Sequence, residues 1–525
     1  MKKIISVALC VVIILTLFSF TASAVGPSSS QLKCENDIVN AITNMKTVVD
    51  VSKYGFKCSV QNNIAYCPEV DDILSKIYYN HPELNFYVDA NGYTYEHRSG
   101  KMLKLNIKYT MDKETVIIKR KYLADWAAYM HSLINPNWSD MQKTLFIHDY
   151  IVARYYYDNR YFTGGGEIHG MLEMFEEGTG VCQAYAYAML YFLRTEGIKS
   201  YMAISLEDDH GWNVVKIDGK WYHVDATHDD PVFNKYYTLD SLGRVLHNKF
   251  LLSDVEINDG AHDNWYIPFK IDETIVCQKY TGPSIYKEAL TSMVPMSDGY
   301  WYYLDYDYSN GGLRRTKNFT TSELVYSMDS FWNTSNNYYS SYYTGLFAYN
   351  GNLFFTDERQ LYVYDPEESQ TVDVFGLVDN AFNQGDRFFG FNMYDEKCYF
   401  IVAKDANFDK NTTSLISAGV CEHGHAIKKW STTKEATMFQ EGIMICYCDV
   451  CFETVEEKSL NKLPIPYGAG DTDGSGRVDS TDLAIEKMYL AGLYSNVYGG
   501  ADFDKSGRID AADLALLKLY LSYYG

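Results

Sequence analysis

The sequence predicts a multidomain protein in which an α+β domain is followed by a β-rich repeat region and a small all-α calcium-binding module. Its 525 residues exceed the size at which a single hydrophobic core keeps growing, so several domains are expected. A composition of 47% hydrophobic and 22% charged residues is typical of globular proteins. The patterning changes along the chain, from mixed helix and strand signals to short aromatic strands and then to a duplicated acidic loop.

The first residues have the pattern of a secretory signal peptide. Lys2 and Lys3 precede an apolar run over 4–20, and small residues at the −3 and −1 positions predict cleavage after Ala24. An uncleaved anchor helix is the alternative. No later stretch reaches 18 uninterrupted apolar residues, so we expect a secreted protein with no membrane contact after cleavage. The net charge of −22 argues against a nucleic-acid partner, because a polyanion would be repelled.

The extension that follows mixes helix and strand patterns. The segment "DDILSKIYYNHPEL" predicts a helix that ends near His81-Pro82, and "KLNIKY" alternates like a strand. Cys58 and Cys67 flank a short polar turn that suits a local disulfide in an oxidising compartment. A further helix is predicted around "MQKTLFIHDYIVARYYYD", where apolar residues recur at helical spacing.

Cys182 stands alone between hydrophobic stretches and opens an apolar segment suited to a buried helix. A helix N-terminus favours a thiolate, which is the nucleophilic form of cysteine. His210 begins "HGWNVVKI", whose alternation predicts a strand, and Asp218-Gly219 is a hairpin signal. The returning strand "KWYHVDA" carries Asp225, so the hairpin would bring His210 and Asp225 together near one end. In that arrangement Cys182 attacks an amide carbonyl, His210 transfers the proton and Asp225 orients the imidazole.

Three motifs in this segment, "GTGVCQAYA", "HGWN" and "GKWYHVDAT", resemble the transglutaminase-like superfamily. The resemblance covers roughly 140–265 and implies a papain-like α+β core with Cys182 as nucleophile, His210 as general base and Asp225 as orienting acid. His228 departs from the D-A-T-W-D-D pattern that is common in bacterial members, and it either packs against the site or marks altered substrate choice. The Cys182 backbone N–H is one candidate oxyanion donor, with Gln183 and His169 as further neighbours.

The same triad serves amide hydrolysis, deamidation and acyl transfer to lysine, because all three reactions pass through a thioester. Secreted bacterial members of the superfamily are more often hydrolytic, so the resemblance favours a cysteine peptidase that acts on a protein or peptide. The alternatives are a protein-crosslinking transglutaminase or deamidase and a catalytically silent binding module. No organic cofactor is implied.

Short aromatic strands separated by polar turns fill the region 275–416. The segments "SDGYWYYLDYD", "YNGNLFFTDERQLYVYD" and "DEKCYFIVAKD" recur at a spacing of roughly 50 residues. This period predicts stacked antiparallel units, either propeller-like blades or an open array of sheets.

Two twelve-residue segments near the C-terminus match a calcium-loop pattern. Each has oxygen-bearing side chains at positions 1, 3, 5, 9 and 12, a glycine at position 6 and a backbone carbonyl ligand at position 7. The predicted ligands of two calcium ions are Asp471, Asp473, Ser475, Arg477, Asp479 and Asp482 in the first loop, and Asp502, Asp504, Ser506, Arg508, Asp510 and Asp513 in the second.

The duplication continues past the loops at a constant offset of 31 residues, which aligns apolar positions such as Leu483 with Leu514. The segment "PIPYGAG" precludes a helix entering the first loop, and aspartate replaces the glutamate that an EF-hand has at position 12. This pattern resembles a type I dockerin, which implies binding to a scaffoldin cohesin and a place on a cellulosome or cell surface. The resemblance assigns cohesin contact to Ser480, Thr481, Ala511 and Ala512, whose unequal polarity predicts one preferred docking orientation.

A cluster of cysteines and histidines lies between the β-rich region and the dockerin. Cys421, His423, Cys448 and Cys451 have thiolate and imidazole groups with zinc-ribbon spacing, and similar Cys-rich repeats occur in secreted surface proteins. Disulfides or free thiols are the alternatives in a secreted chain.

The predicted segments follow from these patterns. They are 1–24 for the signal peptide, 25–139 for an α/β extension, 140–265 for the transglutaminase-like core, 275–416 for the β-rich repeat region, 418–462 for a Cys/His-rich mini-module and 466–525 for the dockerin.

Overall fold

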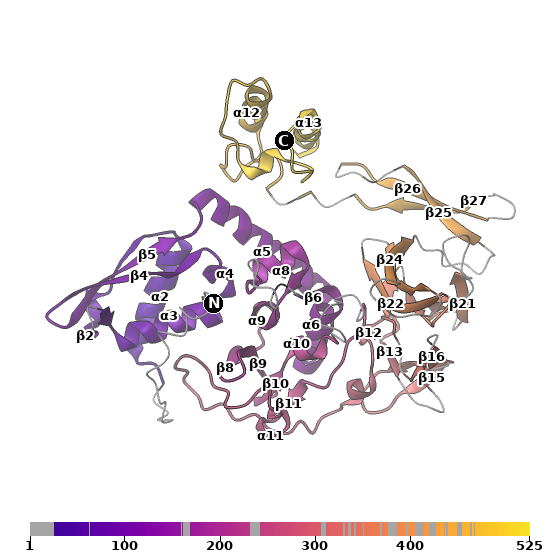
Figure 1. Ribbon diagram of the computed structural model, residues 1–525, viewed down its shortest axis with the longest axis horizontal. Helices are drawn as coiled ribbons and strands as arrows, with labels where there is room; N and C mark the ends of the chain where they lie inside the picture. The colour runs from indigo at the N-terminus through magenta and orange to yellow at the C-terminus, as the bar shows by residue number, and fades with distance from the viewer. Residues whose placement is uncertain are drawn as a thin grey trace, which may run out of the picture. The chain divides into compact units, whose positions relative to one another are not determined.

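A computed structural model describes most of the chain (Figure 1). The chain divides into two compact units. The first unit contains residues up to 112, 127–238 and 247–282, and the second contains 113–126, 239–246 and 283–525. The described residues are 26–61, 64–158, 160, 168–231, 242–305, 311–328, 331–333, 338–340, 343–349, 351–367, 370–375, 386–394, 397–404, 413–418, 427–434, 436, 439–448, 454–462, 465–466 and 468–524. The predicted signal peptide lies outside them.

Over residues 26–61 and 64–112, the first unit combines three helices with two small antiparallel sheets. The helices are α2 (Ser29–Thr43), α3 (Pro68–Asn80) and α4 (Pro82–Asn85), with a 3-10 turn η1 (Ser52–Tyr54). A three-stranded sheet has the order β1 (Val48–Asp50), β5 (Lys101–Tyr109) and β4 (Val88–Arg98), and β2 (Ser59–Gln61) pairs with β3 (Ile64–Tyr66). The predicted helix end is confirmed, because α3 stops at Asn80 and Pro82 begins the next helix.

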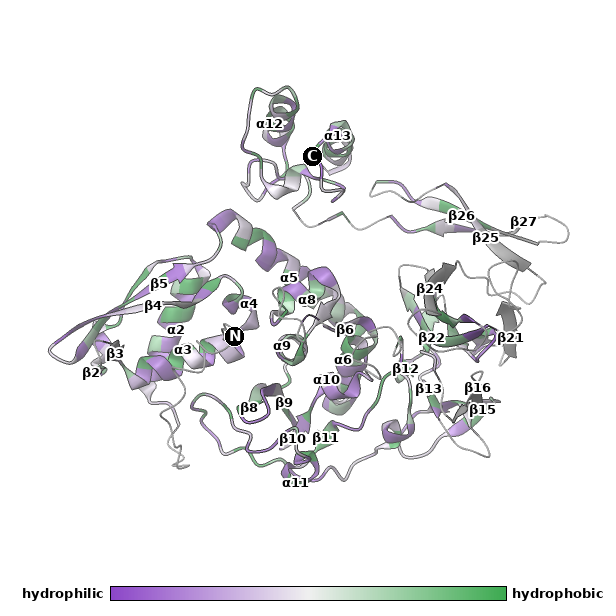
Figure 2. Ribbon diagram, viewed as in Figure 1, coloured by the Kyte–Doolittle hydropathy of each residue, from purple (hydrophilic) through white to green (hydrophobic). Residues whose placement is uncertain are grey.

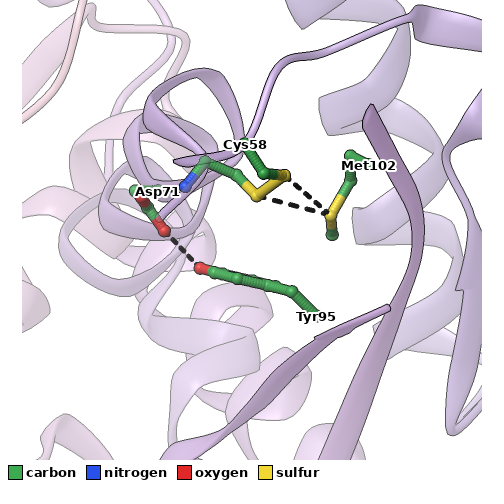
Figure 3. The surroundings of a disulfide bond; sticks show 5 residues. Cys58, Asp71, Tyr95 and Met102 are labelled. Carbon is green, nitrogen blue, oxygen red and sulfur yellow. Dashed lines mark hydrogen bonds between the residues drawn. A yellow bond between two sulfur atoms is a disulfide. The ribbon is translucent and has the colours of Figure 1, made fainter. Parts of the chain in front are cut away.

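A disulfide joins Cys58 to Cys67, as their spacing predicted (Figure 3). Both sulfurs lie against the thioether of Met102, and the Tyr95 hydroxyl donates to Asp71 beside them. The disulfide therefore ties the β2–β3 hairpin to the start of α3, which begins immediately after Cys67.

The rest of the first unit is an α+β core. Helices α6 (Asp140–Arg154), α8 (Met171–Glu177) and α9 (Cys182–Thr195) accompany a four-stranded antiparallel sheet with the order β11 (Phe250–Leu252), β10 (Lys220–Val224), β9 (His210–Ile217) and β8 (Ser200–Ser205). Smaller elements are β6 (Tyr156–Tyr157), β7 (Thr179–Gly180), α10 (Ala226–Asp229) and α11 (Asp254–Ile257). The amide of Asn213 in β9 donates to the Ala186 carbonyl in α9 at 3.0 Å, which fixes the sheet against the helix.

The long helix α5 (Lys113–Leu133) precedes this core in the chain. Hydrophilic residues interrupt it repeatedly, as Figure 2 shows. Among the described residues, no helix combines the length and the hydrophobicity that crossing a bilayer requires.

The middle of the chain consists of successive antiparallel sheets, as the aromatic repeats predicted. The first has the order β12 (Val294–Pro295), β13 (Trp301–Asp305), β14 (Gly312–Thr316) and β15 (Glu323–Ser327). The second contains β18 (Phe347–Tyr349), β19 (Asn352–Thr356), β20 (Leu361–Asp365) and β21 (Gln370–Phe375), and the third contains β22 (Arg387–Tyr394), β23 (Lys397–Ala403) and β24 (Thr413–Ala418). Strands β16 (Phe331–Asn333) and β17 (Tyr338–Ser340) form a separate pair, and η2 (Ile285–Glu288) precedes β12.

Two further parts complete the second unit. Strands β25 (Ile427–Lys434), β26 (Gly442–Cys448) and β27 (Thr454–Leu460) form a three-stranded antiparallel sheet. The C-terminal module contains α12 (Ser480–Leu490), a 3-10 turn η4 (Gly499–Ala501) and α13 (Ala511–Tyr524). Each of these two helices begins at the end of an acidic loop and continues past it, as the sequence predicted.

Candidate active site and calcium loops

Cys182 is the first residue of α9, the central helix of the core. Val181 caps this helix in an extended conformation, and most of the helix is buried because its residues are apolar on nearly every side. Cys182 itself is only partly buried. Its thiol therefore lies at the positive end of a 14-residue helix dipole and within reach of solvent.

The predicted hairpin places His210 and Asp225. Asp218 and Gly219 both have positive φ, at 50° and 78°, which is the geometry of a type I′ turn between β9 and β10. Val224 pairs with Asn213, so Asp225 follows the end of β10 close to the start of β9. The Nε2 atom of His210 lies 2.7 Å from Oδ2 of Asp225.

The electrostatics of this pair favour an imidazolium. Burial lowers the pKa of His210, but the charge of Asp225, its hydrogen bond and a hydrogen bond with Cys182 together raise the pKa to about 10. Asp225 is 1% exposed. Burial raises the pKa of this carboxyl, yet the neighbouring histidines hold it well below its ordinary value. The structure therefore brings the three predicted residues together, with His210 between the thiol and the carboxylate.

Asp225 accepts hydrogen bonds from three histidines through the same oxygen. Besides His210, Nδ1 of His228 lies 2.7 Å and Nε2 of His262 lies 2.8 Å from Oδ2. The other oxygen accepts the backbone amides of Thr227 and His228, because Asp225 is the N-cap of α10. Five donors thus hold one carboxylate.

The two additional histidines differ in surroundings. The His228 side chain is 39% exposed and its ring meets that of His210 edge-on, with centroids 4.6 Å apart. His262 is fully buried, and its Nδ1 atom lies 2.8 Å from Asp259. The sequence pattern marked His228 as a departure, whereas His262 was missed. It lies 37 residues after Asp225 in an irregular segment, where no periodicity points to the site.

Trp212 completes the surroundings of the imidazole. Its ring stacks on His210 with centroids 5.4 Å apart and an interplanar angle of 21°. The indole N–H donates to Nδ1 of His223 at 2.9 Å, which fixes the ring. Of the other proposed neighbours, Gln183 donates to the hydroxyls of Tyr78 and Tyr187, and the side chain of His169 is exposed.

Asp229, four residues after Asp225, belongs to a second buried network of hydrogen bonds. His148 is fully buried, with Nδ1 at 2.8 Å from Asp149 and Nε2 at 3.2 Å from Asp229. Burial lowers the pKa of His148, but hydrogen bonds to both carboxylates raise it to about 9. Asp229 also accepts the backbone amide of Lys249. These contacts tie α10, whose N-cap is Asp225, to α6 and to the segment before β11.

The two acidic loops have matching internal geometry. The Oδ1 atom of Asp482 accepts the amides of Thr472 and Asp473, and Oδ1 of Asp513 accepts those of Phe503 and Asp504. The glycines at position 6 have φ of 77° and 81°, as the sharp turn requires.

The donor set of each loop fits calcium. Carboxylate oxygens of Asp471, Asp473 and Asp482 lie within 4.8 Å of one another, as do those of Asp502, Asp504 and Asp513. Burial and the charges of Asp482 and Asp473 raise the pKa of Asp471 to about 6, although a hydrogen bond from the Gly476 amide lowers it in part. In the second loop, Oδ1 of Asp502 is buried and has no hydrogen-bond partner among the described residues. A bound hard cation would lower the pKa of Asp471 and would give Oδ1 of Asp502 a partner.

The remaining predicted residues are placed as follows. Ser475, Arg477, Asp479, Ser506, Arg508 and Asp510 lie within the two acidic loops, and their role as calcium ligands stays a prediction. Ser480, Thr481, Ala511 and Ala512 are all exposed at the starts of α12 and α13. Cys421, His423 and Cys451 lie outside the described residues. The backbone of Cys448 ends β26, but its side chain also lies outside the described set. The choice between zinc and disulfides at this cluster stays a prediction.

Comparisons with known proteins match two parts of the chain. Residues 127–226 match the transglutaminase-like superfamily model, and residues 469–522 match the type I dockerin domain. A search of curated proteins finds no match.

Solved structures give partial likenesses. A crystal structure of a TGase is 12% identical with a TM-score of 0.20, and the match covers 30% of this chain and 48% of that one, less than half of its length. A candidate cysteine protease from Cytophaga hutchinsonii is 14% identical over 27% of this chain and 68% of that one, with a TM-score of 0.17. A candidate protease from Parabacteroides distasonis is 12% identical over 63% and 61%, with a TM-score of 0.20. The two sequence matches carry the assignment: the chain contains a transglutaminase-like core and a C-terminal type I dockerin domain.

Proposed function

We propose that this protein is a secreted thiol enzyme that acts on protein amide bonds, and specifically a cysteine peptidase. The supporting observation is that His210 interacts with both the Cys182 thiol and the buried Asp225 carboxylate. Superfamily membership of the core agrees with thiol chemistry. We also propose that the dockerin anchors the enzyme to a scaffoldin cohesin, on a cellulosome or at a cell surface.

The chemical roles follow from the orientation of the imidazole. Nε2–H of His210 donates to Asp225, so Nδ1 is the nitrogen that exchanges a proton with Cys182. The thiolate attacks the carbonyl carbon of the amide, and the backbone N–H of Cys182 at the helix start is available to the developing oxyanion. The C–N bond then breaks, His210 gives its proton to the leaving amine and a thioester remains.

Water completes the reaction. His210 removes a proton from the water as it attacks the thioester, which releases the acid and regenerates the thiol. An amine that attacked the same thioester would instead give an isopeptide bond. The identity of the second reactant therefore separates a peptidase from a transglutaminase.

A peptide library tests this proposal. The full chain is incubated with the library in the presence and absence of a lysine analogue, with Cys182→Ala as the matched control. New N-termini that appear with the native protein but not with the variant support a peptidase. Incorporation of the lysine analogue without cleavage would identify acyl transfer instead, and conversion of glutamine to glutamate without cleavage would identify deamidation. The absence of all three products would leave only a binding role.

The calcium and cohesin roles rest on the dockerin loops. Their clustered carboxylates and the unpartnered Oδ1 of Asp502 support one calcium ion in each loop. The exposed residues at loop positions 10 and 11 are polar in the first copy and alanine in the second. Cohesin affinity would therefore depend on which copy faces the partner.

A paired substitution tests the preferred orientation. Cohesin affinity is measured by surface plasmon resonance for Ser480→Ala/Thr481→Ala and for Ala511→Ser/Ala512→Thr. We expect unequal effects from the two variants in calcium and no binding with a chelator. Equal effects would rule out a preferred orientation, and binding that survives calcium removal would rule out the calcium requirement.

A further inference from the structure

Glu486 occupies a core position of the dockerin that the second repeat fills with leucine. The offset of 31 residues that relates the two loops aligns Glu486 in α12 with Leu517 in α13. Leu517 is fully buried and belongs to an apolar cluster with Ala469 and Phe503. Glu486 is also fully buried. The first repeat therefore has a buried carboxylate at the position where the second repeat has a buried hydrocarbon side chain.

The Glu486 carboxylate has no partner among the described residues. Both Oε1 and Oε2 are buried, and neither has a hydrogen bond. An unsatisfied buried charge costs several kcal/mol unless an opposite charge lies nearby. Burial of Glu486 is therefore unfavourable unless another interaction compensates for it.

The charges around Glu486 indicate what that interaction is. Burial, followed by the charges of Asp513 and Asp482, raises the pKa of Glu486 to about 7, and only Lys518 opposes them. Asp482 and Asp513 are the position-12 residues of the first and second loop. Asp482 lies one helical turn before Glu486 in α12, and Asp513 has the equivalent position before Leu517 in α13. Without cations, the negative charges of both position-12 residues therefore disfavour an ionised Glu486.

We propose that Glu486 is an additional acidic group of the calcium-binding apparatus, shared by the two loops. Two divalent cations would turn the repulsion around this carboxylate into attraction, whereas the calcium-free module carries it as a destabilising charge. Glu486 thereby makes the fold of the dockerin depend more strongly on calcium than the twelve loop ligands alone would. This inference rests on the proposed calcium binding and is independent of the thiol chemistry.

Hydrogen exchange in the full chain tests the proposal. Exchange is measured by mass spectrometry for peptides within 468–524, in calcium and in chelator, for the native protein, Glu486→Gln and Glu486→Leu. The readout is the factor by which calcium slows exchange. We expect this factor to fall by about tenfold or more in both variants, because calcium affinity follows the charge around the site. Glu486→Leu should also slow exchange in chelator, since it removes the buried polar group.

Matched controls separate the possible outcomes. Glu457→Gln removes the same charge from an exposed strand position and should leave the calcium factor unchanged. A calcium factor in Glu486→Gln equal to the native one would overturn the role of Glu486 while leaving the calcium sites intact. No calcium response in the native protein would overturn both proposals.

Two loop variants test whether Glu486 serves both sites. Asp473→Ala disables the first loop and Asp504→Ala the second, so each leaves a single ion to bind. Adding Glu486→Gln should reduce the remaining calcium factor in both backgrounds. A reduction in only one background would show that Glu486 belongs to one loop and would overturn the shared role.

Discussion

Nε2 of His210 and Oδ2 of Asp225 are 2.7 Å apart, and the same oxygen also meets His228 and His262. This carboxylate holds three histidines around one buried charge. In the proposed mechanism it also orients the His210 imidazole toward Cys182. Substitutions at each member of this group separate the two functions.

Removing the carboxylate should impair chemistry more than binding. We expect Asp225→Ala to lower kcat by about 10²- to 10⁴-fold with little change in KM, because His210 loses the group that fixes its orientation and its charge. Steady-state kinetics on a cleaved peptide check this. A variant that kept native kcat would show that Asp225 is structural only.

The raised pKa of His210 predicts activity that persists into alkaline solution. Its folded pKa of about 10 lies above the ordinary histidine value, so the imidazolium is present at lower pH and is lost as pH rises through 10. The alkaline limb of kcat/KM should lie near pH 10 and move to lower pH in Asp225→Asn. A limb near pH 6.5 in the native enzyme would contradict this assignment.

His148 predicts a fall in stability between neutral and alkaline pH. Its folded pKa of about 9 exceeds the ordinary value of 6.5, so its contribution is complete below pH 6.5 and is lost as pH rises toward 9. In this window the free energy of unfolding should fall by up to about 1.4 kcal/mol per pH unit. Urea unfolding measured from pH 6 to 9 should show that the free energy of unfolding falls less steeply with pH in His148→Gln than in the native protein. Should that variant fail to fold, an NMR titration of the His148 ring gives the same test.

The two extra histidines should differ in their effect on stability. His262→Ala removes one buried donor from each of two carboxylates, Asp225 and Asp259, and should cost about 2–4 kcal/mol. His228→Ala removes a partly exposed ring and should cost about 1 kcal/mol or less. Urea unfolding followed by tryptophan fluorescence compares them. Equal losses would mean that burial does not govern the strength of these contacts.

Local patterns predicted the parts of the site that regular elements hold. Cys182 begins α9, Asp218-Gly219 forms the predicted hairpin turn, and the register of β9 with β10 sets Asp225 beside His210. Short-range rules suffice here because turn chemistry and strand alternation fix which side chains meet.

Contacts made by irregular segments were not predictable in the same way. His262 reaches Asp225 from a loop without periodicity, and His148 contacts Asp229, which lies 81 positions later in the chain. In the dockerin, most positions of the two helices match as apolar pairs, and the sequence alone did not indicate that Glu486 is buried. The burial of this one mismatched residue follows from the packing of the folded module.

Labelling of Cys182 by an electrophilic peptide tests the central claim that His210 activates this thiol. The native chain and His210→Ala are treated with a peptidyl acyloxymethyl ketone at neutral pH, and the modified cysteine is mapped by tandem mass spectrometry. Cys34, Cys277 and Cys398 serve as internal controls, because their free thiols are buried. Selective modification of Cys182 that slows by at least about 10²-fold in His210→Ala is the predicted result. Equal rates in the two proteins, or no modification of Cys182, would contradict the proposed mechanism.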